Sequence, residues 1–270
     1  MYEFTSIKPE YDKEKISTDK IMLFDKLQIK NLCFRFPGRK QILNDINLNL
    51  TKGEVVAILG ESGGGKSTLL NILQGFYKAE SGSVLLNNQS LGDIYLPNLR
   101  DALGVVPQDI AVFNGTLLDN LTLGGTEAEL KACIEFCQQT GFEKYFSLFP
   151  QSYATLLGEQ GINISGGQKQ LIGLCRALFK KPSLLLLDEP TSAMDIDMEN
   201  FALKILNNYK NQCGILIVTH QLKIANVANR IYILKDSTIQ AEGTKEDLLN
   251  TKNLYSQMMA EIVQTTSFIN

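Results

Sequence analysis

The sequence contains no apolar run long enough to cross a membrane. Its strongest apolar segments, Ser183–Leu187 and Gly214–Val218, have the length of strands and end beside polar residues. Basic residues are not in excess, because 26 Lys and Arg stand against 29 Asp and Glu and give a net charge of −3. We therefore expect no nucleic-acid partner. The start Met1-Tyr2-Glu3 lacks the basic and apolar stretches of a signal peptide, so a protein serving a membrane would act from its cytoplasmic side.

Histidine occurs once and cysteine five times in the 270 residues, and no internal repeat or low-complexity segment is present. Cys133 and Cys137 are spaced i,i+4 in a segment with helical periodicity. They could be half of a metal site, or two small, partly buried residues in a reducing cytoplasm. We favour the second interpretation, because no histidine or further cysteine lies nearby in the sequence to complete a ligand set.

The order of the predicted elements indicates an α/β fold. Residues 1–26 are charged and weakly periodic, which predicts a linker or tail, and strand-like alternation begins at Leu27. Continuous apolar strands alternate with helices, which is typical of a mostly parallel sheet covered by helices, and a helical insertion interrupts it from about Gly115. We expect strands over 27–36, 41–49, 53–59, 82–91, 103–106, 184–187, 215–218, 231–234 and 238–241, and helices over 68–77, 127–139, 165–178, 198–209 and from 245 onward.

A glycine-rich segment between a predicted strand and a predicted helix fits the pattern G-x-x-x-x-G-K-[ST]. Glycines let successive backbone N–H groups turn toward phosphate oxygens, and the helix that follows directs its positive end at the same charge. Lys66 would contact the β- and γ-phosphates of ATP, and the Ser67 hydroxyl would bind Mg²⁺. The expected nucleotide-contacting residues are Gly60, Glu61, Ser62, Gly63, Gly64, Gly65, Lys66, Ser67 and Thr68.

Two carboxylates follow the apolar strand Leu184–Leu187. Asp188 would hold Mg²⁺ through its water shell, and Glu189 would polarise the attacking water as general base. A strand that ends in acidic residues is weak evidence alone. Together with the glycine-rich loop it predicts a site that binds and hydrolyses ATP.

Between these two elements lies Ile164-Ser165-Gly166-Gly167-Gln168, and at this point the chain resembles the ATP-binding cassette (ABC) family. The family signature is Leu-Ser-Gly-Gly-Gln, and Ile164 keeps the size and apolarity of the leucine. An ordinary helix cap after a glycine turn is the alternative interpretation of the segment alone. The resemblance implies that Ser165, Gly166, Gly167 and Gln168 contact the γ-phosphate of an ATP held by a second subunit.

Four further residues match family elements in the expected order. Gln108 resembles the Q-loop glutamine, which touches Mg²⁺ and reports to the membrane domain. Asp195, in Ser192–Asp195, resembles the D-loop at the dimer interface. His220 resembles the switch histidine at the γ-phosphate, and Phe36 falls where the family usually stacks a tyrosine on adenine. The implied catalytic residues are Glu189, His220, Lys66 and Gln108, and the implied Mg²⁺ ligands are Ser67, Gln108 and Asp188.

The family implies a P-loop NTPase (RecA-like) core in a domain from 27 to 270. It also implies an N-terminal antiparallel β-subdomain and an inserted α-helical subdomain at about 115–180. Intact motifs on both sides predict ATP and Mg²⁺ as ligands and a homodimer with ATP sandwiched between subunits. We expect the isolated domain to be soluble and to act at the cytoplasmic face of a bacterial inner or plasma membrane, with a transmembrane permease fused upstream of residues 1–26.

An exporter is the favoured transporter type. Leu157–Gly161 resembles the exporter X-loop, Val112–Leu121 also resembles exporters, and the charged leader suits a linker from a membrane domain. The likeness is to bacterial peptide, bacteriocin and haemolysin-type exporters. The alternatives are the separate ATPase subunit of an importer and a soluble ABC ATPase outside transport. A nucleotide-binding regulator without turnover would be expected to lose Glu189 or His220, and both residues are present.

Overall fold

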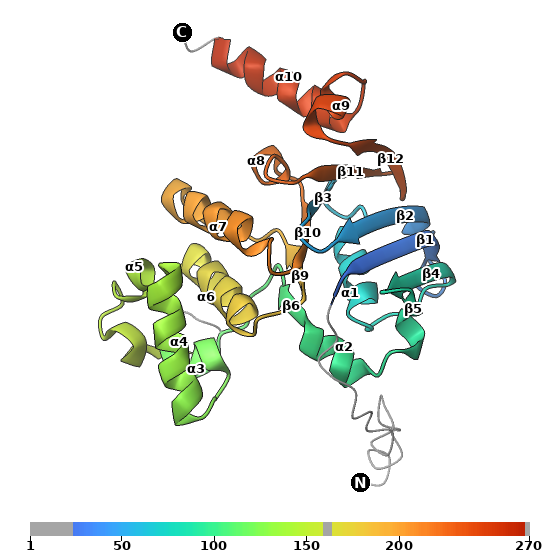
Figure 1. Ribbon diagram of the computed structural model, residues 1–270. Coiled ribbons are helices and arrows are strands. Elements are labelled where there is room, and N and C mark those ends of the chain that lie inside the picture. The colour runs from blue at the N-terminus through green and yellow to red at the C-terminus, as the bar shows by residue number, and fades with distance from the viewer. Residues whose placement is uncertain (1–23, 159–163, 268–270) are drawn as a thin grey trace.

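A six-stranded sheet forms the centre of the computed structural model, which describes residues 24–158 and 164–267 (Figure 1). The strand order is β12-β11-β3-β10-β9-β6, and only the β11–β12 pair is antiparallel. The bounds are β3 (Val55–Leu59), β6 (Leu103–Val106), β9 (Leu184–Asp188), β10 (Gly214–Thr219), β11 (Arg230–Lys235) and β12 (Thr238–Gly243).

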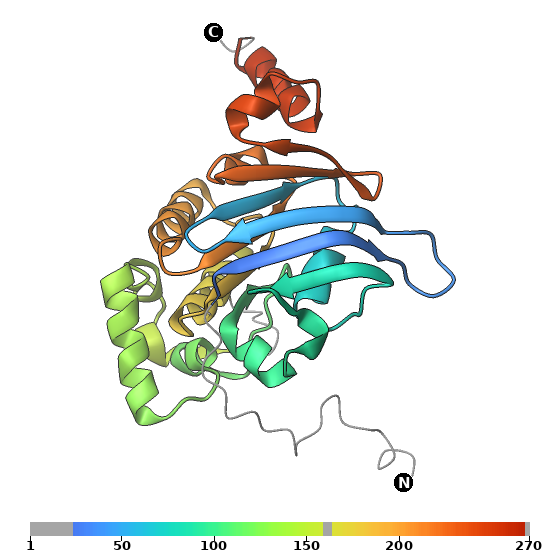
Figure 2. The same cartoon turned by 45° about the vertical axis from the view of Figure 1, so that its right-hand side comes forward.

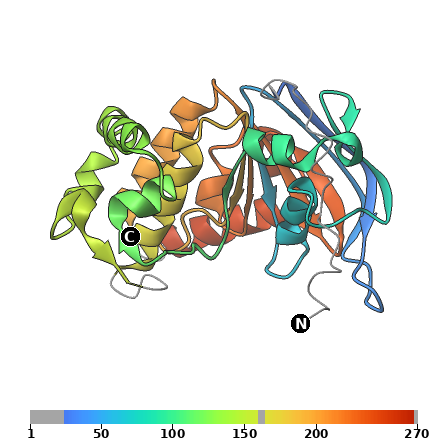
Figure 3. The same cartoon turned by 90° about the horizontal axis from the view of Figure 1, so that it is seen from below.

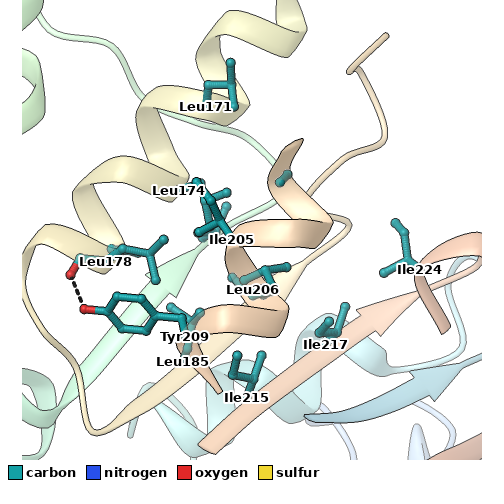
Figure 4. Packing of buried hydrophobic residues seen from close by; sticks show 14 of the residues in the cluster. Leu171, Leu174, Leu178, Leu185, Ile205, Leu206, Tyr209, Ile215, Ile217 and Ile224 are labelled. Atoms are coloured by element: carbon teal, nitrogen blue, oxygen red, sulfur yellow. Dashed lines mark hydrogen bonds between the residues drawn. The ribbon is translucent and has the colours of Figure 1, made fainter. Parts of the chain in front are cut away.

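The central strands are buried on both faces, which explains why they are apolar without alternation. On β3, Val55 and Ala57 belong to the core beneath the helices, whereas Val56 and Ile58 belong to the core beneath the antiparallel sheet. Figure 4 shows the first of these cores, where α6 (Gly166–Phe179) and α7 (Ile196–Tyr209) cover β9 and β10. There the Tyr209 hydroxyl donates a hydrogen bond of 2.9 Å to the carbonyl of Leu178.

The second sheet covers the opposite face of the central sheet and encloses α1 (Lys66–Leu73) (Figure 2). Its order is β2-β1-β4-β5, and its paired strands are antiparallel. The strands are β1 (Lys26–Phe34), β2 (Leu43–Thr51), β4 (Ser81–Leu86) and β5 (Gln89–Ser90). β2 alternates strictly from Ile46 to Thr51 between buried apolar and exposed polar residues, as expected for a sheet with one wet face.

The remaining helices form a helical subdomain or precede and follow single strands of the central sheet. Figure 3 shows the helical subdomain and the antiparallel sheet on opposite sides of it. The helical subdomain contains α3 (Leu117–Thr122), α4 (Glu127–Thr140), α5 (Glu143–Phe146) and the small pair β7 (Gly115–Thr116) and β8 (Leu156–Leu157). α2 (Leu96–Ala102) precedes β6, and α8 (Leu222–Ala225), α9 (Lys245–Leu249) and α10 (Leu254–Ser267) follow β10. Within the described ranges, no helix is long and apolar enough to span a bilayer.

Most predicted elements appear within a few residues of their expected bounds, and two differences have clear causes. The helix α2 was not predicted, because its seven residues bury only Leu99 and Ala102 and therefore show little periodicity. The predicted boundary at Leu27 is late, since Phe24 is 4% exposed and packs into the core. An ideal Cβ on Gly214 would lie 2.3 Å from the Phe24 ring, so this contact requires a glycine there.

The two cysteines that were predicted to be partly buried lie deeper than expected. Cys133 and Cys137 are fully buried rather than partly buried, and Cys175 of α6 places its sulfur 3.6 Å from that of Cys137. A third cysteine therefore lies close to Cys137 in space, although the two are 38 positions apart in the sequence. In the part of the chain that the structure describes, no group of three His, Cys, Asp or Glu side chains has the geometry to hold a metal ion.

Replacing Phe24 tests whether the end of the predicted linker belongs to the domain. Phe24→Ala should lower the free energy of unfolding by about 3 kcal/mol, because a buried aromatic ring is lost and leaves a cavity over Gly214. Urea denaturation measures this change. The control is Leu148→Ala, whose side chain is 75% exposed. Equal, small effects of both substitutions would contradict the placement of Phe24 in the core.

Candidate functional site

The glycine-rich loop connects β3 to α1 and surrounds the Lys66 ammonium group. Lys66 is 6% exposed, and its Nζ donates hydrogen bonds to the carbonyls of Gly60 (2.8 Å) and Glu61 (2.9 Å). Gly65 caps α1 with φ 93°, a left-handed conformation that glycine adopts without a Cβ penalty. No side chain caps α1, so the positive end of the helix stays available to an anion.

The start of the loop is fixed against the neighbouring strands. Gly60 donates its backbone N–H to the carbonyl of Thr219 on β10, at 3.2 Å. An ideal Cβ on Gly60 would lie 2.4 Å from the backbone oxygen of Leu234, so any side chain here would displace β11 or the loop. Because β3 pairs with both β10 and β11, the loop emerges from a rigid position in the sheet.

Glu189 follows β9 and is held by groups at the end of β10. Its Oε1 accepts a hydrogen bond from the backbone N–H of His220 at 2.9 Å and lies 2.6 Å from Nδ1 of the same residue. Its Oε2 accepts a hydrogen bond from the Thr219 hydroxyl at 3.0 Å. Glu189 is 6% exposed and has φ 47°, so its backbone adopts the left-handed conformation at the point where the carboxylate leaves the strand. These contacts fix the orientation of the carboxylate.

The three predicted Mg²⁺ ligands line one cavity of about 560 Å³. Ser67 and Gln108 are exposed, whereas Asp188 is 8% exposed at the end of β9. Burial raises the pKa of Asp188, and nearby Glu189 adds to the rise, while a hydrogen bond with Ser67 and the charge of Lys66 oppose it. A hydroxyl, an amide and a carboxylate are oxygen donors of the kind that Mg²⁺ prefers, so these residues fit the ion.

The Lys66 ammonium group shares this charged environment. Burial lowers its pKa, and the carboxylates of Glu189 and Asp188 counteract the change. A cation placed between buried carboxylates and loop carbonyls is suited to receive the phosphate groups of a nucleotide.

Phe36 lies beyond the end of β1 in a small aromatic cluster. Its ring meets those of Phe34 and Tyr77 edge to face, at centroid distances of 5.1 and 5.3 Å. Phe36 is only partly buried, so its ring can still offer surface to a base. Phe34, two residues earlier at the end of β1, is buried in the core.

The signature serine and the D-loop aspartate make their side-chain contacts away from the glycine-rich loop. The Ser165 hydroxyl caps α6 by accepting a hydrogen bond from the backbone N–H of Gln168 at 3.1 Å. Asp195 caps α7 in the same way through Met198. Both residues are exposed. Residues 159–161 of the predicted X-loop lie outside the described residues.

Two contributors to the site were missed by the sequence analysis. Thr219 is fully buried and holds Glu189, and its position immediately before His220 was the available signal. Gln170, two residues beyond the signature, donates hydrogen bonds to the carbonyl of Glu189 (3.1 Å) and to the hydroxyl of Ser192 (2.9 Å). Its contacts are long-range, and no local pattern revealed them.

A phosphate loop after β3 and an acidic strand end on β9, both parallel to the strand β10 that lies between them, define a P-loop ATP-binding domain. Comparison with known proteins specifies the family. A family model described as ABC transporter matches residues 43–192. The chain therefore belongs to the ABC transporter family, as its ATP-binding and ATP-hydrolysing domain.

Two curated relatives and one solved structure illustrate the likeness. The chain is 34% identical over 256 residues to an ABC transporter ATP-binding protein of Bacillus subtilis, YwjA, covering 95% of this chain and 44% of that protein. It is 36% identical over 234 residues to the alpha-hemolysin translocation ATP-binding protein HlyB of Escherichia coli, covering 86% and 33%. A bacterial Atm1-family ABC exporter with ATP bound matches with TM-score 0.82 and 31% identity, covering 89% of this chain and 42% of that one. The chain thus spans less than half of each.

Lys66→Ala should weaken ATP binding at least tenfold, because a hydrogen bond to a charged group is worth about 1.5–3 kcal/mol. Equilibrium titration with a fluorescent ATP analogue measures the affinity. Lys131→Ala removes an exposed lysine on α4, paired with Glu127, and should leave the affinity unchanged. An unaltered affinity of the Lys66 variant would count against the phosphate site.

Glu189→Gln should abolish turnover while ATP stays bound, because the amide keeps the shape of the side chain but cannot accept a proton. A lost general base slows a reaction by roughly 10²- to 10⁴-fold. Phosphate release and nucleotide retention are measured on the same sample. Glu135→Gln makes the same chemical change on the exposed face of α4 and serves as the control. Hydrolysis at the wild-type rate would refute the assignment of the base.

Proposed function

We propose that this chain is the motor domain of an ABC exporter and works as one half of a dimer that closes around two ATP molecules. The observation that carries the proposal is the division of the site. Lys66 and Glu189 are both buried, and the charge of Glu189 acts on Lys66. Ser165, by contrast, is exposed at the start of α6 and bonds only within its own first turn among the described contacts. A second copy is needed to bring the two parts together.

Within one subunit, the described residues have separate roles in hydrolysis. Lys66 and the backbone of the loop bind the phosphates, and Phe36 offers its ring to the base. Ser67, Gln108 and Asp188 would hold Mg²⁺, which when bound neutralises charge on the phosphates.

Glu189 orients and deprotonates the attacking water. Thr219 and the backbone N–H of His220 fix the two carboxylate oxygens, so the base is preorganised for this step. The His220 side chain is 49% exposed and faces Glu189 through Nδ1, which leaves Nε2 on the other side of the ring for a γ-phosphate.

Ser165, Gly166, Gly167 and Gln168 act on the ATP of the other subunit. The helix α6 begins at Gly166 and presents its N-terminal dipole, and the Ser165 hydroxyl, which accepts a hydrogen bond in its cap contact, can donate its O–H. Asp195 would lie at the interface between the two copies. ATP binding then closes the dimer, and hydrolysis reopens it.

The exporter assignment rests on the relatives. HlyB is described as a translocation protein and the Atm1-family structure as an exporter, and the chain covers 33% and 42% of them. A transmembrane permease is the partner that such a motor would drive, at the cytoplasmic face of the membrane. Its fusion upstream of residue 27 remains a prediction, as does the homodimer.

Ser165→Arg tests the dimer directly. A guanidinium at the start of α6 should block closure around ATP while each subunit binds ATP as before. In the Glu189→Gln background, size-exclusion chromatography with ATP should show a dimer that disappears when Ser165→Arg is added. Ser147→Arg, an equal change at an exposed position after α5, should leave the dimer intact. Persistence of the dimer with Ser165→Arg would reject the sandwich arrangement.

A further inference from the structure

The segment that follows Gln108 is attached to the signature helix α6 through one arginine. Arg176 donates hydrogen bonds from Nη1 to the carbonyl of Ala111 (2.5 Å), from Nη2 to Oδ1 of Asn120 (2.9 Å) and from Nε to the Asn120 carbonyl. Its guanidinium also lies 5.5 Å from the ring centroid of Phe113. We call these four residues the Arg176 junction.

Asn120 extends the junction inward. It is 1% exposed, and its amide donates to the carbonyls of Phe113 (2.9 Å) and Thr116 (3.0 Å). Its Oδ1 also accepts the backbone N–H of Phe113 at 2.8 Å. The segment 111–120 is therefore one hydrogen-bonded unit, and Arg176 joins that unit to α6. Burial lowers the pKa of Arg176 to about 10, so the guanidinium is still charged at neutral pH.

The contacts between segment 108–114 and α6 are concentrated near the middle and end of the helix. Gly173 lies one turn before Arg176 on the same face, and an ideal Cβ there would be 2.5 Å from Ile110. Toward the start of α6, by contrast, the same segment and the residues Gly166 and Lys169 line an open cavity of about 900 Å³. On this face α6 therefore contacts the segment closely at Gly173 and Arg176 and borders the cavity nearer its start.

The part of α6 that borders the cavity carries the signature. Ser165 precedes Arg176 by eleven residues, which corresponds to about 16 Å along an α-helix. A rigid helix converts a small rotation at its anchored part into a displacement at Ser165. Gln170, between the two, ties α6 to Ser192 and to the carbonyl of Glu189.

Gln108 is positioned differently. It comes two residues after Val106, whose strand β6 is paired with β9 at Leu187 in the central sheet. The sheet therefore sets the place of Gln108, and loss of the Arg176 junction leaves that pairing intact. The part that loses an attachment is α6.

We propose that Arg176 is a positioning residue that aligns the signature of its own subunit with the ATP bound by the partner subunit. It acts through α6 and Ser165, and it does not act on the ATP of its own subunit through Gln108. The inference rests on the proposed ATP-sandwich dimer.

Mixing variants separates these two routes. Arg176→Met removes the hydrogen bonds and keeps an unbranched side chain, and it should lower ATP turnover about tenfold. Its affinity for a fluorescent ATP analogue should equal that of the wild type. Adding inactive Lys66→Ala protein in large excess creates mixed dimers in which the ATP of the Arg176 variant faces an intact signature. Turnover per Arg176→Met molecule should then rise at least about fivefold.

Two control variants show what rescue and absence of rescue look like in this mixing experiment. Ser165→Arg should be rescued by Lys66→Ala, because its defect lies in the signature offered to the partner. Gln108→Ala should not be rescued, because its defect stays with its own ATP. Arg176→Met should follow Ser165→Arg. If it follows Gln108→Ala, or if it turns over ATP at the wild-type rate alone, the inference is wrong.

The remaining outcomes are also decisive. If Ser165→Arg is not rescued, the proposed ATP-sandwich dimer is wrong, and the inference that rests on it is wrong as well. The Ser165→Arg mixture identifies this case, because it tests the dimer without Arg176→Met. Thermal melting establishes that Arg176→Met is folded. If it is not, Arg176→Lys keeps the charge but loses the planar fork, and it should show a smaller loss with the same rescue. A loss without rescue would overturn the inference.

Discussion

The burial of parallel strands on both faces is the constraint on which the rest of the structure depends. β6, β9, β10 and β3 pair side by side in the same direction, so their carboxyl ends lie along one edge of the sheet. Gln108, Glu189, His220 and the glycine-rich loop each follow one of these strands. Apolar packing far from the chemistry thereby brings together residues that are up to about 160 positions apart in the chain. The polar side chains of the site could not by themselves bring these distant segments together.

The catalytic carboxylate and the phosphate loop are held by hydrogen bonds to a single strand. Both carboxylate oxygens of Glu189 are bonded to the end of β10, and the start of the loop is bonded to the same residue pair through Thr219. One strand therefore sets the relative position of base and phosphate loop. The helical layer is attached less uniformly, since α6 meets the segment after Gln108 closely at Gly173 and Arg176 and faces a cavity nearer its start.

Local sequence patterns were sufficient for those parts of the site that consist of neighbouring residues. The loop around Lys66, the acidic strand end and the signature segment are each contiguous, since backbone groups of one turn must converge on one phosphate. Thr219, Gln170 and Arg176 were not found, because their partners lie 19 to 65 positions away and leave no periodic trace. The position of Phe24 was missed for the same reason: the small residue that admits its ring, Gly214, belongs to the other end of the chain.

The distribution of thiols has a practical consequence for following the motion of this domain. Cys133, Cys137, Cys175 and Cys213 are buried, and Cys33 alone among the five has intermediate exposure. Thiol reagents reach accessible sulfurs far more readily than buried ones. Replacing Cys33 would therefore give a nearly silent background for a single introduced cysteine. Spin labels or dyes placed at the start of α6 and on the central sheet could then test whether the helix moves when nucleotide binds.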